Sequence, residues 1–361
     1  MRGFVKYYIF TFITLLILIH PQHTVEYARG AMTMCADVLC PSLFPFFVCS
    51  GLLVYSGFCE VLSKIFRPVM RPLFNVSGSG AAAFVLGIIS GYPIGAETAC
   101  RLYENGSVTK NECERLLAFC NNSGPLFILG SVGVAVYHSP KIGAMLYFVH
   151  ILAAFTVGII FRFYRKGESV GEPLYTQRTE TALADMFSKA LSGSVTSILT
   201  VCGAVVFFSV VANLIADLIP DRTWRTVFVA LSELTSGIKG ISDSELSQGM
   251  KVILSAATAG FAGACVHLQV MSVAHGKRLS LRPYIIGKVC HAMLSALYMS
   301  ILLRFFPLTK TVFASGSTLS GAFFAASVFT CGCAAVLAVV SAVVMLCQLH
   351  KKSKTSTAAD C

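Results

Sequence analysis

The sequence predicts an all-α polytopic membrane protein with two inverted repeats, about eight transmembrane helices and two re-entrant hairpins. Of its 361 residues, 55% are hydrophobic and only 12% are charged, and the mean hydropathy is +0.74. Soluble domains carry about a quarter charged residues. Several apolar runs exceed the ~18 residues that suggest a membrane-spanning helix. Polar residues interrupt some of these runs at corresponding places in the two halves.

Membrane topology explains the net charge of +11. Lys and Arg stand mainly in short loops and at the termini, as they do in loops that stay on the cytoplasmic side. We therefore expect the lipid bilayer as a partner and no nucleic acid. The 14 cysteines are scattered through apolar segments, where cysteine packs as a small hydrophobe. Cys331 and Cys333 could hold a metal, but no His or further Cys lies nearby to complete a site.

The first expected segment is an N-terminal signal-anchor helix within residues 1–30. Arg2 and Lys6 precede the apolar run 7–19, which ends at a His-Pro pair. A cleaved signal peptide is the alternative, but no small-x-small cleavage site follows. In either case the chain starts on the cytoplasmic side.

Residues 31–164 are expected to form the first membrane repeat. Its first helix, over 32–58, has two prolines four residues apart, which predict a kinked or locally unwound start. A basic, amphipathic connector over 64–74 follows. It has the pattern of an interfacial helix, which we expect Pro68 and Pro72 to break.

A short apolar segment at 81–103 predicts the first re-entrant hairpin. The apolar part is too short to span a membrane alone, and a Gly-Tyr-Pro sequence followed by Gly95 interrupts it. We place the tip of the hairpin near 91–95. The alternative is an ordinary short, kinked helix.

The run 116–137 is long enough to span a membrane, yet its middle is polar. Asn121, Asn122 and Ser123 precede Pro125, which lacks an N–H and interrupts a regular helix. The freed backbone groups cannot face lipid, where each unsatisfied group costs several kcal/mol. They must face protein or a wet cavity, and transporters use such breaks to hold a solute at mid-bilayer.

A helix over 142–163 completes the first repeat, and a charged cytoplasmic linker over 165–186 follows. The second repeat, 187–308, has the same order of elements. It comprises a long helix, a short polar-ended hairpin, a broken span and a closing helix, at 187–218, 227–240, 252–273 and 284–306. Residues 309–361 hold a final transmembrane helix and a basic tail.

The closing helices of the two halves give the sharpest sign of repetition. His291 stands 141 residues after His150, and Arg304 stands 142 residues after Arg162. The positive-inside rule favours re-entrant hairpins, because only then do all the basic loops and both termini share the cytoplasmic side. The first half then begins outside and the second inside, so the repeats are inverted, a recurrent plan of secondary transporters.

The four polar breaks are expected to converge on one solute site. Half-helix N-termini suit an anionic group, and side-chain amides supply both donors and acceptors. His267 could pair with an anion when protonated or take part in proton coupling. Ionisable residues inside a membrane are costly and usually functional. The expected substrate-binding residues are Ser90, Tyr92, Glu97, Asn121, Asn122, Ser123, Glu233, Thr235, Ser236, His267 and Gln269.

Structural roles compete with several of these assignments. Asn121 and Asn122 could only bridge helices, Glu97 could lie at the membrane surface, and Tyr92 could simply pack. His150 and His291, alone on apolar helices, are expected to be structural hydrogen-bond partners. The sequence has no nucleotide-binding P-loop, HExxH or GxSxG motif. We therefore expect no catalytic residue, no metal and no cofactor, and hence no enzyme.

Five motifs in order resemble the YlbJ (SpoVV) family of sporulation integral membrane proteins, whose two halves are similar to nucleoside-recognition Gate domains. The motifs are PSLFPFF at 41–47, SGYPIGA at 90–96, FCNNSGPLF at 119–127, ELTSGI at 233–238 and GFAGACVHLQV at 260–270. In the last motif the family more often shows a Gly-Gly pair and a Ser. Ala262 and Cys265 stand there in this sequence.

The resemblance implies a membrane transporter acting in endospore formation. It implies movement of dipicolinic acid, a small aromatic dicarboxylate, from the mother cell across the outer forespore membrane. The residues alone indicate only a small polar or anionic solute. Two alternatives stay open, a non-transporting scaffold that recruits sporulation membrane partners and a transporter of nucleoside-like solutes.

Overall fold

A computed structural model describes residues 2–165 and 182–308, and this part of the chain is helical without a strand. The expected all-α fold class is confirmed. The expectations for the final helix, the basic tail, and Cys331 and Cys333 lie outside the described residues, as does most of the linker.

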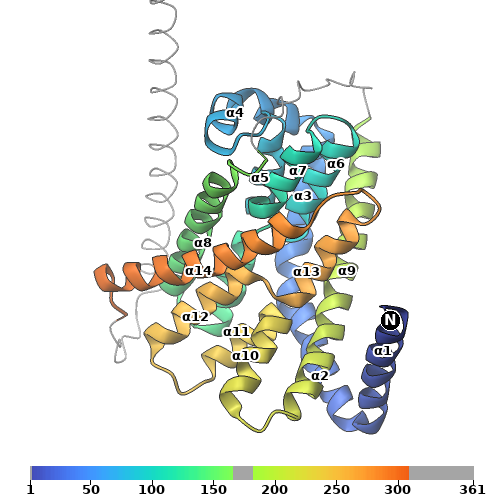
Figure 1. Ribbon diagram of the computed structural model, residues 1–361, viewed down its shortest axis with the longest axis vertical. Helices are drawn as coiled ribbons and strands as arrows, with labels where there is room; N and C mark the ends of the chain where they lie inside the picture. Colours follow the sequence, from blue (N-terminus) through green and yellow to red (C-terminus); the bar gives the residue numbers. More distant parts are fainter. Residues whose placement is uncertain (1, 166–181, 309–361) are drawn as a thin grey trace, which may run out of the picture.

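The first half of the chain gives one group of helices (Figure 1). They are α1 (Arg2–Ile19), α2 (Pro21–Met34), η1 (Cys35–Leu39), α3 (Cys40–Tyr55), α4 (Phe58–Phe74), α5 (Gly80–Ser90), α6 (Ile94–Glu104), α7 (Lys110–Cys120), η2 (Leu126–Val136) and α8 (Pro140–Phe161). The two segments η1 and η2 are π-helical. A wider π-helical turn directly before the prolines of α3 agrees with the locally unwound start expected there.

The second half gives the other group. Its helices are α9 (Leu183–Asp217), α10 (Arg222–Ser232), α11 (Leu234–Ser242), α12 (Gln248–Phe261), α13 (Gly263–Ala274) and α14 (Arg282–Phe305). Helices α9 to α14 follow the same order of elements as the first half: a long helix, a hairpin, a broken span and a closing helix.

Four helices of the described chain are long and apolar enough to cross a membrane: α8, α9, the α12–α13 pair and α14. A fifth span results if α1 is counted together with α2 and η1, which it meets at an angle of 98°. The halves α7 and η2 have 11 residues each, so neither is long enough alone. Large apolar side chains such as Leu199 and Met293 are 66% and 68% exposed, as lipid-facing residues are.

The expectation that two prolines break the connector is wrong. α4 runs without interruption from Phe58 to Phe74 with Pro68 and Pro72 inside it. An interior proline costs about 3 kcal/mol. Burying one large apolar side chain returns about 1.5–3 kcal/mol. The helix buries several of them along one face, namely Leu62, Val69, Met70, Leu73 and Phe74, and this burial outweighs the two lost hydrogen bonds.

The two halves are arranged with opposite orientations. The hairpin of α5 and α6 gathers at one end of the molecule with α4, whereas the hairpin of α10 and α11 lies at the other end (Figure 1). Corresponding helices of the two halves pack against each other, α3 against α9 and α8 against α14. The second arm of each broken span contacts a hairpin of the other half, α13 on α6 and η2 on α11.

Polar contacts show which loops share the α4 end. Lys277 forms an ion pair with Glu104, and Arg165 lies 3.5 Å from the Glu114 carboxylate. The hydrogen bond to Glu104 raises the pKa of Lys277 above its usual value. Glu114 also accepts the Ser280 backbone N–H at 2.8 Å, so the end of α6, the end of α8 and the loop before α14 lie together.

A second set of contacts defines the opposite end. The Tyr137 hydroxyl donates to the Lys251 carbonyl at 3.1 Å, and the Lys251 ammonium donates to the Ser242 carbonyl at 2.8 Å. The loop after η2 thus lies with the loop after α11. Each hairpin enters and leaves at a single end, as the re-entrant interpretation expects.

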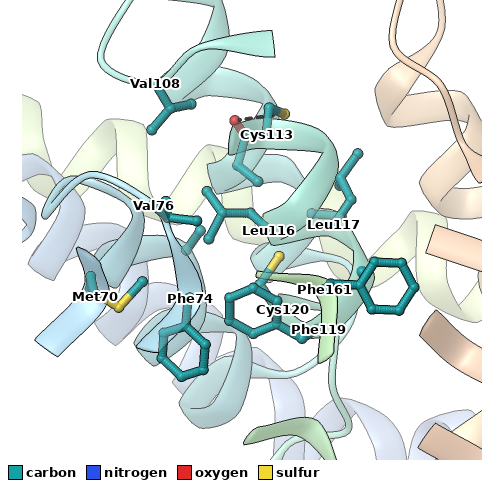
Figure 2. Close-up of a cluster of buried hydrophobic side chains, with 14 of the residues drawn as sticks. Met70, Phe74, Val76, Val108, Cys113, Leu116, Leu117, Phe119, Cys120 and Phe161 are labelled. Atoms are coloured by element: carbon teal, nitrogen blue, oxygen red, sulfur yellow. Dashed lines mark hydrogen bonds between the residues drawn. The ribbon is translucent and has the colours of Figure 1, made fainter. Parts of the chain in front are cut away.

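An apolar core fixes α7 directly before its end (Figure 2). Phe119 stacks on Phe74 with ring centroids 4.8 Å apart, and Leu116 and Leu117 are fully buried beside them. The Cys113 thiol donates to the Ala99 carbonyl of α6 at 3.4 Å. Because interiors are close-packed, this core holds the residues that follow Cys120 in a defined place.

Candidate functional site

The polar break after α7 is closed off from solvent. A capping box of Thr109 and Glu112 starts α7, and the helix ends at Cys120 with Asn121 in an extended conformation. The chain returns to helix only at Pro125, the residue before η2. Asn121, Asn122 and Ser123 are each 1% exposed, so their polar groups face protein.

Glycines bring the tip of the first hairpin against this break. A Cβ on Gly87 would stand 1.8 Å from the Cys120 carbonyl oxygen, and one on Gly95 would stand 2.0 Å from it. Gly91 has a φ of 82° and lies directly on Gly124. Only glycine permits approaches this close, so these positions fix the hairpin tip on the break.

The second half repeats this contact between hairpin and break. Ala262 and Gly263 both adopt the left-handed conformation between α12 and α13, with φ values of 77° and 76°. A Cβ on Gly263 would lie 3.2 Å from the Ser232 carbonyl oxygen at the tip of the second hairpin. The Tyr92 hydroxyl donates to the Ala259 carbonyl at 3.0 Å and so joins the first tip to the second break. The four breaks therefore meet, as the sequence led us to expect.

The centre of this meeting point contains a lysine that sequence reasoning missed. Lys288 of α14 is 1% exposed, and its ammonium donates to the Asn121 carbonyl at 2.9 Å. The ammonium nitrogen lies 5.2 Å from the centroid of the Tyr92 ring. The signal was present, because a single lysine inside the apolar run 284–306 is an ionisable residue at membrane depth.

The paired histidines lie beside the first break. The Ser123 backbone N–H donates to Nε2 of His150 at 3.0 Å, which places any ring proton of a neutral His150 on Nδ1. Nε2 of His291 donates to the His150 carbonyl at 2.9 Å, and the two ring centroids are 4.4 Å apart. Both residues are hydrogen-bonded between helices, as expected of structural partners.

His267 and Gln269 belong to the second break. Nδ1 of His267 shares a 2.8 Å hydrogen bond with the Tyr284 hydroxyl, and Tyr284 lies beside Asn121. The Gln269 amide nitrogen lies 3.5 Å from the Cys265 sulfur. Tyr284 thus connects the histidine of the second half to the amides of the first.

Seven buried polar atoms around the breaks have no hydrogen-bond partner among the described residues. They are Asn121 Nδ2 and Oδ1, Asn122 Oδ1, Ser123 Oγ, His150 Nδ1, His267 Nε2 and Gln269 Oε1. Buried polar groups in native structures are nearly always hydrogen-bonded, so such a concentration requires an explanation. These donors and acceptors are free to bind a small polar molecule or water.

The second hairpin uses its polar residues to cap its own helix. The Glu233 carboxylate is buried and accepts the backbone N–H groups of Thr235 and Ser236 at 2.9 and 2.7 Å. The Ser236 hydroxyl lies 3.2 Å from that of Ser209 on α9. These hydrogen bonds satisfy free backbone N–H groups at the N-terminus of α11. Glu233, which we expected to bind solute, therefore has a structural role as a helix cap.

Glu97 lines a side cavity. Its carboxylate pairs with Arg101 at 2.5 Å, and its side chain is 30% exposed. This cavity of about 300 Å³ lies between α3, α6 and the start of α9, and is lined by Ser50, Ser63, Glu97, Arg101, Lys189 and Ser197 among others. Ser90 is buried, and its hydroxyl is hydrogen-bonded to that of Ser50 on the cavity wall.

Comparisons with known proteins agree with the family predicted from the five motifs. A family model described as nucleoside recognition (Gate) matches residues 37–218, half of the chain. The sporulation integral membrane protein YlbJ of Bacillus subtilis (strain 168) is 28% identical over 329 residues, with 81% of each chain covered. No solved structure matches the chain.

Proposed function

This integral membrane protein belongs to the nucleoside-recognition (Gate) family, and we propose that it is a sporulation-associated transporter of a small anionic solute. The observation that carries the proposal is the set of seven unpartnered polar atoms where four helix breaks meet. The name of the Bacillus subtilis relative supports the association with sporulation.

The energetic cost of these atoms argues for a functional role. Leaving one buried donor or acceptor unsatisfied costs about 1–3 kcal/mol, whereas a whole domain is stable by about 5–15 kcal/mol. Seven such atoms around the breaks would therefore consume much of the stability of the fold. A bound solute that supplies their hydrogen bonds removes this cost, and its departure restores it.

We propose that the solute is dipicolinic acid, carried from the mother cell across the outer forespore membrane. The break supplies amide donors from Asn121 and the Ser123 hydroxyl for oxygen atoms. The Tyr92 ring, held by its hydroxyl on Ala259, supplies a flat surface for an aromatic ring. A small aromatic dicarboxylate combines both features.

The side cavity is the proposed route of access. The central amides are 1% exposed, so the described state is closed to the solute. The cavity reaches Ser50, which contacts Ser90 immediately before the hairpin tip. A small movement of the α5–α6 hairpin would connect the cavity to the centre, as alternating access requires.

Uptake of radiolabelled dipicolinate into liposomes containing the purified protein tests this function. Asn122→Ala and His267→Ala are each expected to lower uptake by about ten-fold or more, since each removes part of the polar centre. Thr200→Ala is the matched control, because this exposed α9 hydroxyl bonds only its own helix. Wild-type uptake in both centre variants would refute the site.

The description of the Gate family favours a nucleoside as the second candidate solute. Uridine uptake in the same liposomes, without dipicolinate uptake, would support it. A scaffold that recruits sporulation partners makes a third prediction: alanine at the breaks is tolerated in spore formation, whereas changes in the linker 165–186 are not.

A further inference from the structure

We propose that the Lys288 ammonium binds a carboxylate of the transported solute and so selects anions over neutral, nucleoside-like molecules. The inference rests on the proposed transport function and assigns charge selection to one side chain at its centre. Lys288 is a specificity residue in this account, since it would touch the solute directly.

No protein carboxylate neutralises Lys288 among the described residues. Four acids near the breaks in sequence already have partners: Glu233 caps α11, Glu97 pairs with Arg101, Glu114 lies against Arg165, and Asp243 pairs with Lys239. The other ionisable groups beside Lys288 are three histidines, the Cys120 thiol and the Tyr92 hydroxyl, and none of them is a carboxylate. A buried charge without a counter-charge is strongly unfavourable, so the site is built for an anion that comes from outside the chain.

The hydrogen bonding of the ammonium is also incomplete. An ammonium group has three N–H donors, and one of them binds the Asn121 carbonyl. The Tyr92 ring face lies at 5.2 Å, where it attracts the cation but accepts no full hydrogen bond. The other two donors have no acceptor in the part of the chain that the structure describes, and a carboxylate offers two oxygens.

Neighbouring groups complete a carboxylate-binding set. The Asn121 side-chain nitrogen and the Ser123 hydroxyl are both buried, next to the hydroxyls of Tyr284 and Tyr92, and neither makes a hydrogen bond of normal geometry among the described residues. They lie on the same break whose carbonyl holds Lys288. A carboxylate bound here would receive one charge-assisted and two neutral hydrogen bonds, while an attached aromatic ring would lie alongside Tyr92. A neutral nucleoside would leave the ammonium unpaired.

Three variants separate the effect of the Lys288 charge from the effect of the shape of its side chain. Lys288→Met keeps the length of the side chain without its charge, Lys288→Arg keeps the charge, and Lys239→Met removes an exposed lysine of α11 as a control. Uptake of dipicolinate and of uridine into liposomes is measured for each. We expect Lys288→Met to lose dipicolinate uptake by about ten-fold or more, the size of effect for a lost charged hydrogen bond, while its uridine uptake equals or exceeds that of the wild type.

Lys239→Met should take up as much dipicolinate as the wild type, and Lys288→Arg should retain part of the dipicolinate uptake. Dipicolinate uptake by Lys288→Met equal to that of the wild type would overturn the inference and leave the transport function standing. A wild-type protein that binds dipicolinate but does not carry it would refute transport, and would leave only the carboxylate-binding role of Lys288 standing.

A measurement on the wild-type protein covers the case in which Lys288→Met does not fold. Dipicolinate should raise the Tm of the purified protein, whereas its uncharged dimethyl ester should not. Equal stabilisation by acid and ester, or none by either, would overturn the role of Lys288.

Discussion

Single residues control how closely the first hairpin approaches the α7 break. The Cys120 carbonyl lies between Gly87 and Gly95, and a Cβ at either position would come within about 2 Å of its oxygen. This contact holds the hairpin tip, with Tyr92, against the break, where the Tyr92 ring centroid lies 5.2 Å from the Lys288 ammonium. The geometry of the proposed site therefore depends on the absence of a side chain at both glycines.

Gly95→Ala is expected to lower the stability of the protein by about 1–3 kcal/mol, because backbone atoms on both sides must move. Thermal unfolding in detergent measures the effect. Gly203→Ala on α9, where nothing lies within 4 Å, is the matched control and should gain up to about 1 kcal/mol from helix propensity. Equal Tm values for the two variants would contradict the close approach.

The sequence predicted the residues of the breaks better than it predicted their partners. Asn121, Asn122 and His267 stand out because polar groups in an apolar run have few structural explanations. Lys288 was passed over because it has no motif around it, and its role depends on the Asn121 carbonyl, 167 residues away. The capping role of Glu233 was not predicted for a similar reason, since it depends on where α11 begins.

At the scale of elements, the long helices of the two halves form a continuous contact. α3 packs along α9, and the Cys40 and Cys202 sulfurs are 3.6 Å apart across that contact. The Cys35 thiol also approaches the Cys202 carbonyl, at 3.9 Å. Three cysteines that are scattered in the sequence therefore share one helix interface.

Mild oxidation of the purified protein should link Cys40 to Cys202, because a short movement brings their sulfurs to bonding distance. Peptide mass analysis without reduction identifies the linked pair. Cys40→Ser is the control, and this variant should not form the linked peptide pair. Failure of the wild type to form this link, when other cysteines are oxidised, would contradict the α3–α9 contact.

Element boundaries show where sequence patterns succeed. Breaks marked by Gly, Pro or amides were predicted near their observed positions, because these residues act locally on the backbone. The continuity of α4 through Pro68 and Pro72 was not predicted, since it depends on burial of Met70 and Phe74 against distant helices. The π-helical form of η2 also had no local signal.

At the scale of the molecule, the opposite orientation of the halves brings two hairpins and two broken spans to one centre. Each hairpin enters from its own end, and the contacts of Glu104 with Lys277 and of Tyr137 with Lys251 separate the two ends. In the proposed transport cycle, movement of one hairpin would open the centre to one side, which suits alternating access.

Single cysteines at Gly106 and Ser244, in a protein lacking its native cysteines, test this arrangement in intact cells. We propose that the α4 end is cytoplasmic, so an impermeant maleimide should label position 244 and not position 106. Permeabilised cells provide the control, in which both positions should react. External labelling of position 106 would refute the proposed orientation.

A structure determined by electron cryo-microscopy in the presence of dipicolinate tests the central claim most directly. The account predicts ligand density between Tyr92, Asn121 and Lys288, with a carboxylate on the lysine ammonium. Density confined to the side cavity at Arg101, or an unchanged polar centre at saturating dipicolinate, would contradict it.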